Sequence, residues 1–153
     1  MSLRLIIEEK YKTALKDKNI SETNTLRLIK SAIKDKDIAS RGATNKEAVA
    51  DKEILSLLQV LVKQRKDSID SFKQASREDL IAIEQTEINI ISKFLPSQMN
   101  ELETEKLIVA IIETQGFEKL KDMGKLMNEL KNNNAGSIDM ALAGKIAKSK
   151  LTN

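Results

Sequence analysis

Residues 54–96 read ILSLLQVLVKQRKDSIDSFKQASREDLIAIEQTEINIISKFLP, and this stretch decides the fold. Its apolar residues recur every three or four positions, which is the spacing of one face of a helix and not the alternation of a strand. They form two groups: Ile54, Leu58, Leu61, Ile69 and Phe72, then Leu80, Ile81, Ile88, Ile91 and Leu95. The polar run 76–79 between the groups predicts the start of a second helix. Because Pro96 disfavours helical geometry at the residue before it, we expect that helix to end at Leu95.

Upstream of this stretch, the same spacing predicts two more helices, at about 2–17 and about 23–39. Thr44 is followed three residues later by Glu47, which is typical of a capping box and predicts the start of the helix that contains Ile54. Helices joined by short loops pack antiparallel. Residues 1–95 are therefore expected to form a four-helix bundle-like N-terminal subdomain.

Downstream, residues 96–100 are expected to be a linker and residues 101–153 a small three-helix C-terminal subdomain. Asn100 and Glu103 form a second capping-box pattern, and Gly116 is typical of the residue just after a helix. Apolar spacing between Leu120 and Leu130 predicts a short helix, 132–136 a loop, and 138–146 part of the last helix. No segment alternates as a strand does, so the predicted fold class is all-α.

Composition removes many functions. The 153 residues contain no cysteine and no histidine, which excludes thiolate chemistry and removes the commonest general base and metal ligand. We predict no catalytic residue, no metal and no cofactor. No apolar run approaches the roughly 20 residues that span a bilayer, and Glu8 and Glu9 follow a short apolar start that does not resemble a targeting peptide. The expectation is a cytoplasmic protein without a membrane span, with a monomer favoured.

The net charge of +3 is compatible with a nucleic-acid partner without requiring one. Arg27, Lys30 and Lys34 stand at positions i, i+3 and i+7, and we expect this basic stripe to lie opposite Ile29 and Ile33. Such a stripe can follow a row of phosphates. An ordinary solvated helix face is the open alternative.

Two further basic clusters have the same two interpretations. Lys63, Arg65 and Lys66 form one, although acids four residues after each lysine, Asp67 and Asp70, are expected to cancel part of its charge. Lys145, Lys148 and Lys150 crowd the last turns of the final helix, where cations also suit the helix dipole.

Three other patterns are interpreted as structural. Gly124-Lys125 and Gly144-Lys145 resemble the end of a phosphate-binding loop, but its first glycine and its Ser or Thr are missing, so close helix packing is favoured. Glu84 and Glu87 share a helix face, and carboxylate metal sites of helical bundles pair such glutamates with histidine, so a solvated acidic face is favoured.

Two stretches resemble the YqeY family, free-standing relatives of a tail domain found in the tRNA-dependent amidotransferase. One runs from Val62-Lys63-Gln64-Arg65-Lys66-Asp67-Ser68-Ile69 through Phe94-Leu95-Pro96, and the other is Asp122-Met123-Gly124-Lys125-Leu126-Met127. With Arg27-Leu28-Ile29-Lys30, the resemblance spans nearly the whole chain. Where members of this family often carry basic residues before the last helix, this chain has Asn132-Asn133-Asn134, so that loop is not basic here.

The resemblance implies an N-terminal helical bundle, a three-helix C-terminal subdomain, and a non-catalytic module that binds tRNA or another structured RNA. The candidate nucleic-acid-binding residues are then Arg27, Lys30, Lys34, Lys63, Arg65, Lys66, Lys125, Lys145 and Lys148. It also implies a label of carbon–nitrogen ligase with glutamine as amide donor, but in the amidotransferase that chemistry occurs in other domains and subunits.

A protein–protein adaptor that docks onto an amidotransferase or another translation factor is the competing class. Met123, Met127 and Met140 would be adaptable contact residues there, with core packing as the alternative use of methionine.

Overall fold

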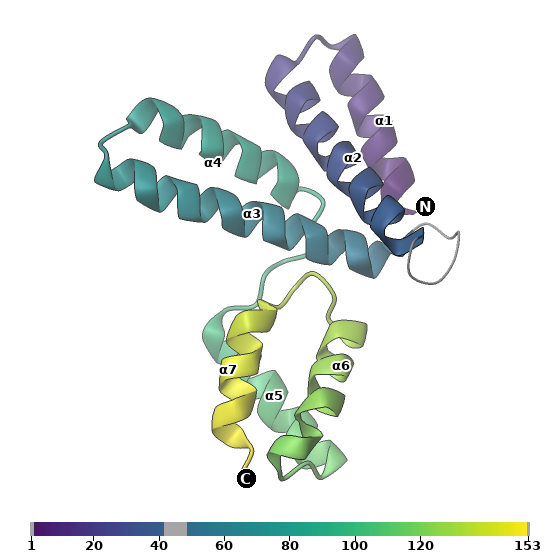
Figure 1. Cartoon of the computed structure of the whole chain (residues 1–153), viewed down its shortest axis with the longest axis vertical. Helices are drawn as coiled ribbons and strands as arrows, with labels where there is room; N and C mark the ends of the chain where they lie inside the picture. Colours follow the sequence, from purple (N-terminus) through teal and green to yellow (C-terminus); the bar gives the residue numbers. More distant parts are fainter. Residues whose placement is uncertain (1, 42–48, 153) are drawn as a thin grey trace. The chain divides into compact units, whose positions relative to one another are not determined.

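The computed structural model describes residues 2–41 and 49–152 (Figure 1). Every regular element of these residues is a helix, and the strand-like pairing found among them is a single bridge between Lys119 and Thr152. The predicted all-α class is therefore confirmed. The chain divides into two compact units, residues 1–95 and 96–153, with the boundary directly before Pro96. That each unit folds as an independent domain stays a prediction.

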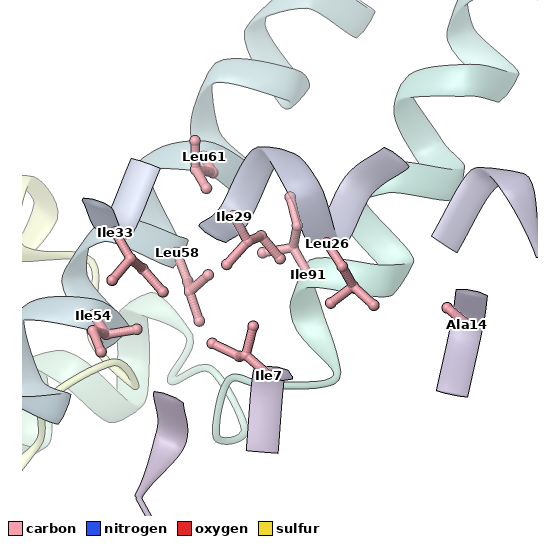
Figure 2. Close-up of a cluster of buried hydrophobic side chains, with 9 residues drawn as sticks. All are labelled: Ile7, Ala14, Leu26, Ile29, Ile33, Ile54, Leu58, Leu61 and Ile91. Carbon is pink, nitrogen blue, oxygen red and sulfur yellow. The ribbon is translucent and has the colours of Figure 1, made fainter. Parts of the chain in front are cut away.

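The first unit consists of two helical hairpins. Helix α1 (Leu3–Lys16) pairs with α2 (Ile20–Arg41), and α3 (Asp51–Gln74) pairs with α4 (Glu78–Ser92). The two hairpins meet at an angle, and α2 contacts both α3 and α4 (Figure 1). The core between them consists of Ile7, Ala14, Leu26, Ile29, Ile33, Ile54, Leu58, Leu61 and Ile91 (Figure 2). Full burial of each large aliphatic side chain contributes about 1.5–3 kcal/mol, so this core holds the unit together.

Some helix ends of the first unit differ from the sequence-based expectation. Helix α2 begins at Ile20 and not at about residue 23, and helix α4 ends at Ser92 instead of Leu95. After Ser92 the backbone changes to the tighter hydrogen-bond pattern of a 3-10 turn. The amides of Phe94 and Leu95 donate to the carbonyls three residues back, at 3.0 and 3.1 Å. Helix α3 begins at Asp51 with Ala50 as its N-cap residue, and the predicted capping box at Thr44 lies outside the described residues.

The ends of α1 and α3 share one geometry although neither is followed by glycine. The amide just past each helix donates to the carbonyl five residues back, Asn19 to Ala14 at 3.0 Å and Arg77 to Phe72 at 2.9 Å. This pattern is the Schellman motif, whose turning residue has a left-handed backbone. Lys18 and Ser76 are those residues, with φ of 56° and 55°. Both tight turns are therefore built on residues that sequence reasoning does not associate with helix ends.

The second unit contains α5 (Glu101–Gln115), a 3-10 turn η1 (Leu120–Asp122), α6 (Met123–Asn133) and α7 (Met140–Lys150). Its core is formed by Ile108, Leu126, Leu130, Ile138, Ala143, Ile146, Ala147 and Leu151. The capping box at Asn100 is present, with Glu103 N–H donating to Asn100 Oδ1 at 2.8 Å. Gly116 takes a φ of 69° at the end of α5, as predicted.

The loop before α7 lies further along the chain than predicted, at residues 134–139. Asn132 and Asn133 belong to α6, and α7 begins at Met140, capped by the side chain of Asp139, so Ile138 is not in the last helix. Asparagine is a poor helix former, but packing of Leu126 and Leu130 in the core extends α6 through these positions.

The expected linker is partly built into the second unit. Gln98 Nε2 donates to the Gly136 carbonyl at 2.5 Å, and Met99 N–H donates to the Ser137 carbonyl at 2.8 Å. Met99 also packs against the core of the unit. The approach to α5 is therefore fixed by the loop before α7.

Candidate nucleic-acid interface

A polar network at the open end of the first hairpin sets the register of α1 against α2. The guanidinium of Arg4 makes two bonds to the carboxylate of Asp37 and donates to the Val49 carbonyl at 3.1 Å. Val49 N–H donates to Asp37 Oδ1 at 2.9 Å, and Leu3 N–H donates to Asp51 Oδ2 at 3.2 Å. Because the Asp37 side chain is only 14% exposed, this two-bond pair is largely shielded from water and holds α1 against α2.

The two contacts that follow along the hairpin involve the predicted stripe. Lys30 Nζ lies 2.9 Å from Glu8 Oε2, and Arg27 Nε donates to the Tyr11 hydroxyl at 2.9 Å. The contacts advance by three residues on each antiparallel helix, which is nearly one turn. In this hairpin, Glu8 and Tyr11 of α1 therefore bind Lys30 and Arg27 of α2, respectively.

Tyr11 also attracts both cations through the face of its ring. Lys30 Nζ lies 4.1 Å and Arg27 Cζ 5.8 Å from the ring centre, both within the range of cation–π attraction. Tyr11 is half-buried against the core of the first unit, so its ring is a fixed support. The positive ends of Arg27 and Lys30 are thus held in place at the surface by α1.

The position of the stripe relative to the core corrects the sequence analysis. At about 100° per residue, the stripe lies beside the face that carries Ile29 and Ile33, not opposite it. Lys30 is half-buried, whereas Arg27 and Lys34 are exposed. Among the described residues, no carboxylate forms an ion pair with Arg27 or Lys34. The stripe therefore contains two cations without an acidic partner and one that has such a partner.

A shallow hollow of about 140 Å³ lies beside the stripe, between α1 and α2. Arg4, Lys30 and Lys34 line it together with Glu8 and Asp37. Arg4 and Lys30 are paired with these two carboxylates, so Lys34 is the cation that this hollow offers to an anion.

The cluster on α3 separates into two kinds of residue. Arg65 is bound to α4, with Nε 2.7 Å from Glu87 Oε2, and its side chain is only 12% exposed. It also donates to the Leu61 carbonyl at 2.9 Å, so it contributes to the pairing of α3 with α4. Lys63 and Lys66 are exposed, and in the described structure neither forms the expected ion pair with Asp67 or Asp70. Both ammonium groups are therefore open to solvent, with Asp67 and Asp70 about one helical turn away.

The remaining candidate cations lie in the second unit. Lys125 is exposed near the start of α6, and Lys145 and Lys148 are exposed on α7. Lys150 instead pairs with Glu105 of α5 at 2.9 Å. Lys125, Lys145 and Lys148 are therefore open to solvent, whereas Lys150 takes part in a contact between α5 and α7.

Asp122 is an acid beside Lys125. Its carboxylate accepts the amides of Glu118 and Lys119 at 3.1 and 3.2 Å. These bonds, with a smaller contribution from Lys121 and Lys125, hold the pKa of Asp122 below its ordinary value. The carboxylate thus stabilises the turn that leads into α6.

The two glycine–lysine pairs differ in their surroundings. A Cβ atom on Gly144 would lie 3.9 Å from the terminal methyl groups of Met123 and Met127, so this glycine is in ordinary contact with α6. A Cβ atom on Gly124 would meet nothing within 4 Å. The packing interpretation therefore fits Gly144 but not Gly124.

The other motifs serve the helical framework. Met123, Met127 and Met140 are partly buried against the second core, which is the packing use of methionine. Glu87 binds Arg65, and the described residues contain no group of three or more side chains arranged to hold a metal ion. No described helix has the length and apolar character that a membrane span needs.

The fold and surface define a class: an all-helical protein of two compact units, with exposed cations on several helices. Within that class the chain belongs to the YqeY-like family, because the family model described as "Yqey-like protein" matches residues 5–151. The resemblance that the sequence motifs indicate is thereby confirmed.

The chain is also similar to fungal proteins named "Altered inheritance of mitochondria protein 41, mitochondrial". It is 29% identical to the one from Saccharomyces cerevisiae (strain ATCC 204508 / S288c) over 130 residues, which cover 82% of this chain and 68% of the relative. It is 33% identical to the one from Clavispora lusitaniae over 129 residues, covering 82% and 72%. The relative from Pyrenophora tritici-repentis is 29% identical over 133 residues, covering 82% and 69%.

These names contradict the expectation of a cytoplasmic protein, since the similar proteins are named as mitochondrial. The expectation rested on the lack of a membrane-length apolar run and on Glu8 and Glu9, acids that argue against a transit peptide. These two features do not by themselves decide the compartment of a protein.

Sequence reasoning missed two residues of the candidate interface, Tyr11 and Glu8. Periodicity assigns Tyr11 to the apolar face of its helix and gives Glu8 no role. The pairing of the two helices could have identified both residues. In an antiparallel hairpin, moving three residues forward from Glu8 to Tyr11 on α1 corresponds to moving three residues back from Lys30 to Arg27 on α2. Using this correspondence requires the register itself, which depends on the contacts of Arg4 and Asp37.

Proposed function

We propose that this protein is a non-catalytic helical module that binds structured RNA, with tRNA as the candidate ligand. The observation that carries the proposal is the state of the stripe on α2. Arg27 and Lys34 are exposed and have no carboxylate partner among the described residues, and Arg27 is held in place by Tyr11. Fixed cations without acidic partners are what a phosphate backbone binds.

Further support comes from the exposed lysines at the other candidate positions, Lys63, Lys66, Lys125, Lys145 and Lys148. Arg65 is left out of the proposed contact set because Glu87 neutralises it. The resemblance to an amidotransferase tail domain supports tRNA over other RNA. With three phenylalanines, one tyrosine and no tryptophan in the chain, stacking on single-stranded bases is disfavoured, so recognition should follow the shape of a folded RNA.

The test is the affinity of the purified chain for bulk tRNA, measured by fluorescence anisotropy at about 50 mM and about 200 mM salt. Three phosphate contacts predict a loss of affinity of roughly 40-fold over this range, from a slope of about 0.9 per contact. Absence of binding at the lower salt concentration would overturn the proposal.

An adaptor that docks onto another protein is a second candidate, and one observation favours it. One stripe of α5 carries apolar side chains among charged ones: Leu102, which is 59% exposed, Val109 and Ala110 lie there together with Glu105, Lys106 and Glu113. Co-elution of the chain with a purified tRNA-dependent amidotransferase in size-exclusion chromatography, lost on Leu102→Gln, would support this role. Unchanged elution of both proteins would exclude that partner.

A further inference from the structure

We infer that Glu8 competes with RNA phosphates for Lys30 and thereby limits the affinity of the basic stripe; this inference rests on the proposed RNA-binding function. Glu8 Oε2 lies 2.9 Å from Lys30 Nζ, a position that a bound phosphate oxygen could otherwise take. An anion that binds Lys30 must therefore displace the carboxylate of Glu8 or share the ammonium with it against the repulsion of two negative charges.

The ion pair is exposed enough to exchange. The side chains of Lys30 and Glu8 are 36% and 40% exposed, so water and dissolved ions reach both partners. Exposed ion pairs are weak and sensitive to salt, whereas a polyanion presents many phosphates at once. Displacement of Glu8 is therefore compatible with binding, at a cost to affinity.

Tyr11 keeps Lys30 available after the displacement. The ammonium lies 4.1 Å from the centre of the Tyr11 ring, an attraction that does not involve Glu8. The ring is half-buried and packs against the core of the first unit. When a phosphate replaces the carboxylate, the lysine head group stays at the surface between Arg27 and Lys34.

Glu8 differs in this respect from the other acid at the stripe. Asp37 is bound by both terminal nitrogens of Arg4 and by the amide of Val49, and its side chain is 14% exposed. Such a carboxylate is held in the framework of the hairpin. Glu8 makes its ion pair with Lys30 from the surface, so it is the acid that an incoming anion can replace.

The experiment compares Glu8→Gln with Glu9→Gln in the binding of bulk tRNA. Both variants remove one negative charge from adjacent positions of α1, but Glu9 is exposed and forms no ion pair in the described structure. We expect Glu8→Gln to raise affinity roughly 1.5- to 5-fold more than Glu9→Gln, which is the factor for one exposed ion pair. The salt slope should also become steeper by up to about one unit.

A second pair of variants tests whether Glu8 affects RNA binding through its ion pair with Lys30. If Glu8 acts through Lys30, then the double variant Glu8→Gln/Lys30→Gln should bind more tightly than Lys30→Gln only by the factor that Glu9→Gln gains over wild type. Equal gains from Glu8→Gln and Glu9→Gln would overturn the competition while leaving RNA binding intact, because net charge alone would explain them. No binding by the wild type or any variant would instead overturn the proposed function, and this inference with it. Melting curves establish that every variant is folded.

Discussion

At the scale of single residues, Ser76 adopts a backbone conformation that suits glycine better. Its φ of 55° is in the left-handed region, where a Cβ atom costs roughly 1 kcal/mol. Ser76→Gly removes that strain but gives the unfolded chain more freedom, so we expect a net gain in stability of up to about 1 kcal/mol. Urea unfolding measures it.

The matched control is Gly116, which occupies the same kind of position with φ of 69°. Gly116→Ala should destabilise the protein by about 1 kcal/mol, since the substitution introduces the strain that Ser76 already carries. If Ser76→Gly destabilised the protein as much as Gly116→Ala, the hydroxyl of Ser76 would have a role that the backbone geometry does not give it.

The carboxyl group of Asp122 makes the stability of the turn before α6 depend on pH. The amides of Glu118 and Lys119 lower the pKa of its carboxyl below the ordinary value of 3.8. A lowered pKa contributes stability that is present above 3.8 and is lost as the pH falls through the pKa of the folded state. We therefore expect wild type to melt above Asp122→Ala at neutral pH and the difference to shrink below about pH 4.

Thermal melts of both proteins from about pH 7 to about pH 2 provide the measurement. A melting difference that grows as the pH falls would show the opposite linkage and contradict the bonding geometry.

At the scale of the helix, Ile29 and Leu28 separate the two faces of α2. Ile29 is 0% exposed in the core of the first unit, whereas Leu28 is 40% exposed. Ile29→Asp buries a carboxylate without a partner and should cost more than about 4 kcal/mol, enough to unfold the unit. Leu28→Asp should change stability far less. Circular dichroism distinguishes the two, and similar losses for both variants would mean that the faces are wrongly assigned.

Features that act within a few residues allowed the helices to be predicted from the sequence. Features that depend on contacts between helices could not be predicted in this way. Asn100 and Gly116 act within a few residues, so the cap and the end of α5 were predictable. The end of α4 was missed because Pro96 sets an upper limit to the helix but does not decide where its hydrogen bonds change. The turn at Ser76 was missed because a non-glycine residue gives no signal of left-handed geometry.

The candidate site was predictable only as a set of cations. The sequence shows where Arg65 and Lys30 stand along their helices. It does not show that Glu87 of another helix binds the first and Glu8 the second, since these pairs depend on how helices pack. The face assignment of the stripe failed for a different reason: the helical period of about 100° per residue already places the stripe beside Ile29 and Ile33, so the sequence was sufficient to avoid that error.

At the scale of the whole molecule, each unit has a core of its own, and we predict that the units unfold separately. Leu130 is 0% exposed in the second core, so Leu130→Ala should destabilise that unit by about 2–5 kcal/mol. Hydrogen exchange should accelerate in α5, α6 and α7 and remain unchanged in α3. Faster exchange throughout the chain would show a single cooperative unit and contradict independent folding.

The stripe variant Arg27→Gln/Lys30→Gln/Lys34→Gln also affects the fold, because Lys30 packs on Tyr11 and pairs with Glu8. Glutamine keeps helix propensity but loses these contacts, so we expect a stability loss of about 1–2 kcal/mol, more than for a fully solvated stripe. That loss leaves the core intact, and melting curves should show a folded protein at room temperature.

The most direct test of the account is the salt dependence of tRNA binding by this variant. Its matched control is Lys10→Gln/Lys73→Gln/Lys93→Gln, which removes three exposed cations of the first unit from outside the candidate set. We predict that the stripe variant lowers the salt slope by roughly two to three units and that the control leaves it within about one unit of wild type. Equal slopes for wild type and the stripe variant, or equal losses for the two variants, would contradict RNA binding by the stripe.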